Sequence, residues 1–251
     1  MFEYLAIITV IGLLSGVLGT GSGGLFVVLF KRIKESSLSV LLGFSAGVMV
    51  AITFVELIPE SIEEGSLFTG LVGLVLGIVV LGFLDFNFPH KHFSFDLNGS
   101  AEKAKQLKTG LLLSVGIAMH NLPEGVAIGT ALLVNFEVGV TLAVLMAIHN
   151  FPEGMAAATA MGVGEIKNSR ILLVTALAGV PMGIGAFIGG ALGGVSEIAL
   201  SISLGFAGGA MLYIVFDELI PDSHRRATGH TAIIGILSGI VIGITFIELL
   251  H

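Results

Sequence analysis

Residues 118–132 read AMHNLPEGVAIGTAL and residues 147–161 read AIHNFPEGMAAATAM, so the chain carries one motif twice. Nine of the fifteen aligned positions are identical, and they include the block His-Asn-x-Pro-Glu-Gly. Each copy lies within an apolar stretch, 107–134 or 138–162, that exceeds the roughly 20 residues needed to cross a bilayer. Consecutive membrane spans run in opposite directions, so the sequence predicts that the two copies form an inverted pair.

The composition of the whole chain is typical of a protein that crosses a membrane several times. Of its 251 residues, 55% are hydrophobic and 12% are charged, against about 25% charged residues in soluble domains. Mean hydropathy is +1.03, and 36 glycines suit closely packed membrane helices. The absence of cysteine excludes disulfides and thiolate metal ligands. The 11 basic residues are scattered, which excludes a nucleic-acid partner.

Eight stretches are long and apolar enough to be membrane spans. They are 4–30, 38–58, 67–86, 107–134, 138–162, 170–195, 198–220 and 230–250. No basic residue precedes the first stretch, so it is predicted to be a retained span rather than a secretory signal. With this division, all 11 Lys and Arg residues fall on one side, which the positive-inside rule assigns to the cytoplasm. Both termini are therefore expected outside.

A second repeat relates the second and seventh spans. Residues 43–61 read GFSAGVMVAITFVELIPES and residues 205–223 read GFAGGAMLYIVFDELIPDS, with eleven of nineteen positions identical. Inverted repeats are typical of transporters, in which two similar halves enclose a site near the middle of the membrane. We therefore predict an all-α membrane protein with eight transmembrane helices in an inverted 3+2+3 arrangement. It forms a single transport domain, 1–251, in which inverted halves at about 1–86 and 170–251 flank a central hairpin, 107–162.

The first motif places ionisable side chains in the middle of two predicted spans. His120 and His149 lie near the bilayer centre, and Glu124 and Glu153 follow them at i+4 on the same helix face. An ionisable group at this depth costs roughly 3 kcal/mol on insertion scales. A divalent cation, bound by imidazole nitrogens and carboxylate oxygens, offsets that cost. The alternative is that these groups only join helices by hydrogen bonds, and the duplication argues against it.

Proline and asparagine extend this prediction. Pro123 and Pro152 have no N–H, so each should free a backbone carbonyl and bend its helix locally. Asn121 and Asn150 add amide oxygens beside the His-Glu pairs. Irregular backbone at membrane depth is tolerated where it lines a cavity. We therefore expect an oxygen-rich metal site at this depth.

Carboxylates on the second and seventh spans are candidates for the path of an ion. Glu56 and Glu60 belong to the second span, and Asp217 and Glu218 belong to the seventh. Intramembrane carboxylates commonly mark ion pathways, so we interpret these four as gate or relay groups, with capping of helix ends as the alternative. Met49 is a weaker candidate for a thioether ligand, because a buried methionine usually serves packing.

The predicted cytoplasmic loop between the third and fourth spans contains the segment PHKHF. His90 and His92 in this segment predict a weak, exposed metal site at the exit. Neighbouring loop histidines are more often simply solvated, which is the alternative here.

The sequence resembles the Zrt/Irt-like protein (ZIP) family of divalent-metal transporters. The resemblance rests on HNLPEG in span 4, HNFPEG in span 5, eight spans, external termini and a histidine-bearing loop between spans 3 and 4. It implies a path between spans 2, 4, 5 and 7 that carries ions towards the cytoplasm. It also implies a midplane site of His120, Glu124 and Glu153, joined by His149 and lined by Met49, and an adjacent site of Asn121, Asn150 and Glu153.

One position departs from the family pattern. Many relatives have a glutamate immediately before a proline in span 6, where this chain has Val180 before Pro181. A carboxylate is therefore missing from the second metal position, which favours one strong site over a binuclear centre.

The predicted function is transport of divalent transition-metal cations. The expected substrate is Zn²⁺, Fe²⁺, Mn²⁺ or Cd²⁺, and no cofactor is expected besides this transported metal. Histidine ligands disfavour Ca²⁺, and the absence of cysteine disfavours Cu(I). The runner-up is an intramembrane metal-dependent hydrolase, but the sequence has no HExxH motif. A proton-coupled carrier of organic solutes would need a basic residue within the membrane to pair with an anionic substrate, and the sequence places none there. The expected location is the plasma or inner membrane, with metal ion and lipid as partners and a homodimer left open.

Overall fold

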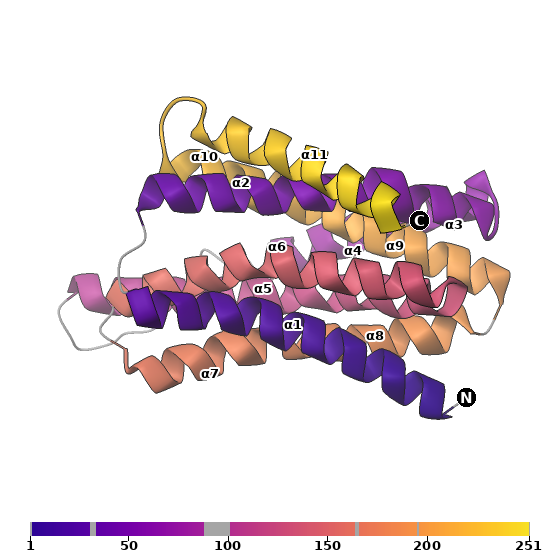
Figure 1. Ribbon diagram of the computed structural model, residues 1–251, viewed down its shortest axis with the longest axis horizontal. Coiled ribbons are helices and arrows are strands. Elements are labelled where there is room, and N and C mark those ends of the chain that lie inside the picture. Colours follow the sequence, from indigo (N-terminus) through magenta and orange to yellow (C-terminus); the bar gives the residue numbers. More distant parts are fainter. Residues whose placement is uncertain (1, 31–33, 88–100, 164–165, 195, 251) are drawn as a thin grey trace.

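The computed structural model describes residues 2–30, 34–87, 101–163, 166–194 and 196–250, and these parts of the chain are almost entirely helical (Figure 1). The elements are α1 (Phe2–Phe30), α2 (Glu35–Ile52), the π-helical turn η1 (Thr53–Leu57), α3 (Ile58–Glu63), α4 (Leu67–Asn87), α5 (Ala101–Val134), α6 (Phe136–Val163), α7 (Asn168–Ala178), α8 (Val180–Gly193), α9 (Glu197–Ile214), the π-helical turn η2 (Val215–Leu219), α10 (Ile220–Arg226) and α11 (Thr231–Leu250).

These elements combine into eight rods, because α2–η1–α3, α7–α8 and α9–η2–α10 each follow one course (Figure 1). Among the described residues, seven rods are long and apolar enough to cross a membrane. The eighth, α4, has an apolar segment, Leu67–Phe83, that is shorter. The all-helical prediction is confirmed. The start of α1 and the end of α11 lie at the same end of the bundle (Figure 1).

The rods form two groups that meet along the bundle axis. In one group α1 packs against α6 and α8, and α5 packs against α6 and α8. In the other, α2 packs against α11, and α4 packs against α9. The groups meet where α5 contacts α9 and where α2 contacts α6. The predicted metal ligands of α5 and α6 therefore lie between the two groups.

Both π-helical turns end two residues before a proline. The N–H of Ile58 donates to the carbonyl of Thr53, and the N–H of Ile220 donates to the carbonyl of Val215. Pro59 and Pro221 follow and have no N–H, which removes one α-helical hydrogen bond in each rod. By contrast, α5 and α6 are assigned as continuous α-helices through Pro123 and Pro152, and the local bends expected there stay a prediction. The sequence pattern ELIP marks both irregular turns.

Contacts in the second group recur at a spacing of 162 residues. A Cβ atom at Gly47 would overlap the carbonyl oxygen of Ile236, and one at Gly209 would overlap that of Leu74. These glycines let α2 approach α11 and let α9 approach α4, backbone against backbone. Each residue of the first pair has its counterpart in the second.

Serine hydrogen bonds between the α2 and α9 rods follow the same spacing. Ser39 Oγ donates to the carbonyl of Ser223 at 2.7 Å, and Ser201 Oγ donates to the carbonyl of Ser61 at 2.6 Å. Ser61 Oγ also donates to the carbonyl of Ser201, at 2.7 Å. The two rods are therefore joined at both ends by buried hydrogen bonds.

Candidate metal site

The histidines and glutamates of the repeated motif are buried between the two groups of helices. His120 and Glu124 project from α5, and His149 and Glu153 project from α6; none is more than 4% exposed. His149 Nε2 lies 3.1 Å from Glu124 Oε1, which joins the two copies of the motif. Its Nδ1 lies 3.3 Å from the carbonyl oxygen of Leu145, one turn earlier. This second contact fixes the ring so that Nε2 faces the carboxylate.

His120 pairs with a carboxylate from another rod. Its Nε2 lies 3.1 Å from Glu218 Oε2, which belongs to the π-helical turn η2. Glu218 was predicted as a gate or relay group, and the structure brings it into contact with His120 of the repeated motif. Glu218 lies in this π-helical turn, so the irregular part of the α9 rod contacts the repeated motif.

The asparagines of the motif bond to each other and to a third rod. Asn150 Nδ2 donates to Asn121 Oδ1 at 2.8 Å, and Asn121 Nδ2 donates to the carbonyl of Ala178, also at 2.8 Å. Ala178 is the last residue of α7, next to the break at Gly179 and close to Val180. The departure from the family pattern thus lies two residues beyond the carbonyl that Asn121 contacts.

Several buried polar atoms of this cluster have no hydrogen-bond partner among the described residues. They are His120 Nδ1, Glu124 Oε2, Asn150 Oδ1, Glu153 Oε1 and Glu153 Oε2. A buried oxygen without a donor costs free energy, and a buried carboxylate costs much more. A divalent cation satisfies carboxylate, amide and imidazole atoms at once, so the donor set suits a transition-metal ion.

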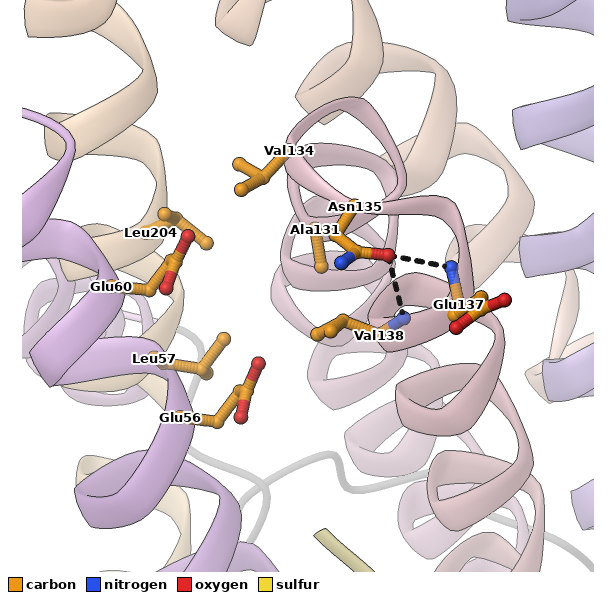
Figure 2. Close-up of a pocket in the computed structure, with 9 residues that line it drawn as sticks. All are labelled: Glu56, Leu57, Glu60, Ala131, Val134, Asn135, Glu137, Val138 and Leu204. Carbon is orange, nitrogen blue, oxygen red and sulfur yellow. Dashed lines mark hydrogen bonds between the residues drawn. The ribbon is translucent and has the colours of Figure 1, made fainter. Parts of the chain in front are cut away.

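Glu56 and Glu60 line a cavity of about 320 Å³ at one end of the bundle (Figure 2). The opposite wall comes from the turn between α5 and α6, where Glu137 also lines the cavity. Asn135 Oδ1 accepts hydrogen bonds from the backbone N–H groups of Glu137 and Val138, at 2.9 and 3.4 Å. The cavity is therefore acidic, and the start of α6 forms one of its edges.

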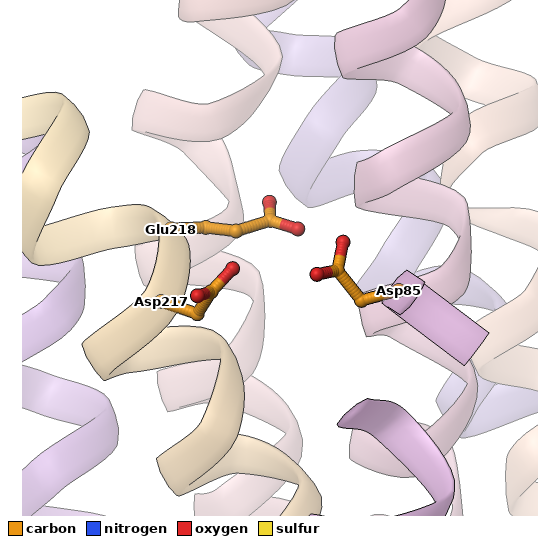
Figure 3. Close-up of side chains that lie close together, drawn as sticks. All are labelled: Asp85, Asp217 and Glu218. Carbon is orange, nitrogen blue, oxygen red and sulfur yellow. The ribbon is translucent and has the colours of Figure 1, made fainter. Parts of the chain in front are cut away.

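Three carboxylates meet at the π-helical turn η2. Asp85, Asp217 and Glu218 point toward one another, with one oxygen of each within 4.8 Å of the others (Figure 3). Tyr213 Oη donates to Asp85 Oδ2 at 3.1 Å, which holds the end of α4 against α9. Sequence reasoning missed Asp85, although it is the one ionisable residue in the predicted span 67–86.

The remaining candidates contribute less. Met49 is fully buried in the apolar core. His90 and His92 lie outside the described residues, so the predicted exit site on that loop stays a sequence-based prediction.

Comparison with known proteins finds zinc transporters both by family model and by individual relatives. The family described as ZIP zinc transporter matches residues 89–250. The chain is 32% identical to the zinc transporter ZupT of Corynebacterium glutamicum, over 90% of this chain and 92% of that protein. It is 32% identical to ZupT of Chlorobium limicola, over 95% of each chain. It is also 30% identical to the zinc transporter ZIPB of Bordetella bronchiseptica, over 92% of this chain and 77% of that protein.

Proposed function

Because the chain belongs to the ZIP zinc transporter family, we propose that it carries Zn²⁺ towards the cytoplasm through the buried cluster between α5 and α6. It is a multi-pass membrane protein that transports divalent metal ions, and it is a transporter rather than an enzyme. The alternative of an intramembrane hydrolase has no support from its relatives.

The observation that carries the proposed site is the buried carboxylate of Glu153. Both of its oxygens are buried without a hydrogen-bond partner among the described residues, on a side chain that is 2% exposed. An ion held there would draw on His120, Glu124 and His149, with Asn150 as a neutral oxygen ligand. Fe²⁺, Mn²⁺ and Cd²⁺ share enough ligand chemistry with Zn²⁺ to be candidate substrates. With Val180 in place of a carboxylate, the proposal has one strong site.

The proposed path runs from the acidic cavity to the three-carboxylate cluster. Glu56 and Glu60 attract the cation at the cavity, which the predicted topology assigns to the outside. Glu218 contacts His120 and also belongs to the cluster with Asp85, so it links the central site to the opposite end. Met49 lines the path on the α2 side in this proposal.

The proposed architecture is an inverted repeat in one domain with both termini outside. Recurrence of the glycine and serine contacts at a spacing of 162 residues supports this arrangement. The π-helical turns η1 and η2 obey the same spacing. Exposed apolar side chains on the outer helices, such as Leu18, Phe83 and Val241, are proposed to face lipid. A homodimer would use part of this same surface.

The proposed function is tested by uptake into proteoliposomes that contain the purified chain. Native protein should accumulate Zn²⁺, and Glu153→Gln should reduce the initial rate at least about a hundredfold, because a desolvated dication needs anionic ligands. Glu197→Gln is the matched control, since Glu197 is exposed at the start of α9 and should leave uptake unchanged. Near-native uptake by Glu153→Gln would refute the proposed site.

A further inference from the structure

The two asparagines of the metal site form a hydrogen-bonded chain that begins at a backbone carbonyl. Ala178 presents a carbonyl oxygen, which can only accept, so Asn121 must direct its NH₂ group toward it. Asn121 then directs its Oδ1 toward Asn150, which must in turn supply its own NH₂ group. The orientation of both amides therefore follows from the carbonyl. Asn150 Oδ1 remains at the end of the chain, buried and without a donor among the described residues.

The Ala178 carbonyl is free because the rod is interrupted immediately after it. In a regular helix this carbonyl would accept from the N–H of Met182. The N–H of Met182 instead donates to the carbonyl of Gly179, at 3.2 Å. The residue before it, Pro181, cannot donate to the Ala178 carbonyl either, because it has no N–H. The proline of this rod thus leaves one acceptor for a side chain from α5.

The corresponding carbonyl of α1, 162 residues earlier, has a different partner. Gly16 accepts from Thr20 Oγ1 of its own helix, at 2.8 Å. The residue that corresponds to Thr20 is Met182, which has no hydroxyl. Asn150 lies against α1, since a Cβ atom at Gly19 would lie 2.8 Å from Asn150 Cβ. On the α1 side, Thr20 already donates to the Gly16 carbonyl. The hydrogen-bonded chain of the two asparagines therefore starts at the Ala178 carbonyl, on the α7 side.

We propose that Asn121 is a positioning residue that makes Asn150 present its Oδ1, rather than its NH₂ group, to the transported cation. Asn150 and Glu153 are three residues apart on α6 and lie on the same face, so this oxygen is directed beside the unpaired carboxylate. The positive end of a free amide would repel a cation at this position. The inference rests on the proposed metal site and assigns different roles to the two asparagines.

The test is a double-mutant cycle on Zn²⁺ affinity, measured by equilibrium dialysis of the purified full chain. Asn121→Ala should weaken Zn²⁺ binding about tenfold, because Asn150 is no longer held in one orientation. Asn150→Asp carries oxygen on both terminal atoms and needs no orientation. Adding Asn121→Ala to Asn150→Asp should therefore change affinity less than about twofold.

An equal loss of Zn²⁺ affinity in both backgrounds would overturn the inference. If Asn121 were a metal ligand or had a purely structural role, its replacement would lower the affinity by the same factor whether residue 150 is Asn or Asp. Asn121→Ser repeats the cycle with a polar side chain that is too short to reach Asn150, and it should give the same pattern of losses as Asn121→Ala. Folding of each variant is checked by its thermal transition. Unchanged Zn²⁺ binding by Glu153→Gln would instead refute the proposed site, whatever the outcome of the cycle.

Discussion

At the scale of single residues, the two histidines of the repeated motif have different partners. His149 contacts Glu124 from the other copy of the motif, whereas His120 contacts Glu218 from the α9 rod. An imidazole favours Zn²⁺ over harder ions such as Mn²⁺, while carboxylates bind both. Loss of one histidine should therefore change selectivity more than it changes total transport.

We expect His120→Ala to lower Zn²⁺ affinity about tenfold and to raise the ratio of Mn²⁺ to Zn²⁺ uptake, because the carboxylates remain while a nitrogen ligand is lost. Uptake of both ions into proteoliposomes, normalised to folded protein, measures this ratio. His230→Ala is a suitable control, since His230 is exposed at the start of α11. A parallel fall in both ions would argue that His120 only supports the fold.

Val180→Glu tests the reason for expecting a single strong site. The added carboxylate would stand two residues beyond Ala178, whose carbonyl accepts a hydrogen bond from Asn121. We expect the number of bound Zn²⁺ ions per chain to rise from one toward two in a metal titration. Val180→Gln has the same length without the charge and should leave the number at one.

Much of the proposed metal site could be predicted from the sequence, because an ionisable side chain in the middle of a long apolar stretch stands out against its background. His120, Glu124, His149 and Glu153 were found in this way. The pairing of His120 with Glu218 could not be predicted, because it depends on how the α9 rod packs against α5. Asp85 was missed because a single carboxylate near the end of a span resembles an ordinary interfacial residue.

At the scale of secondary-structure elements, the backbone contacts of α2 and α9 depend on glycine. We expect Gly47→Ala and Gly209→Ala each to destabilise the protein by about 1–3 kcal/mol, because the new Cβ would overlap a carbonyl oxygen of the neighbouring helix. Thermal unfolding in detergent measures the effect. Gly162→Ala is the control, since a Cβ there would have nothing within 4 Å. Native stability in both variants would mean that these helices can separate at little cost.

The π-helical turns were not predicted, although the sequence contains a signal for them. Pro59 and Pro221 follow the same ELI sequence in both repeats, and each removes one backbone donor. Pro123 and Pro152, for which local bends were predicted, lie within helices that keep the α-helical form, whereas Pro59 and Pro221 follow π-helical turns. Proline alone does not determine the outcome, because packing around the helix decides whether the hydrogen-bond register shifts.

At the scale of the whole molecule, the orientation in the membrane, with both termini outside, is still a prediction. The chain has no cysteine, so single cysteines can be introduced without a background. We expect Glu63→Cys to react with an impermeant maleimide in intact cells and Thr228→Cys to react only after permeabilisation. Both positions are exposed, at opposite ends of the bundle. The reverse pattern of labelling would place the termini in the cytoplasm.

In the proposed inverted repeat, the positions where the two halves differ would set the free-energy difference between the inward-open and outward-open conformations. Two identical halves could exchange their conformations at no net cost, so the inward-open and outward-open populations would be equal. In this chain Asp217 corresponds to Val55, and Asp85 corresponds to Ile247. If the halves exchange in this way, the free energy of these unmatched carboxylates would bias which of the two conformations predominates at rest, and each 1.4 kcal/mol of difference would change their ratio about tenfold. Metal binding at Glu218 would shift that resting ratio by changing the repulsion among the same three side chains.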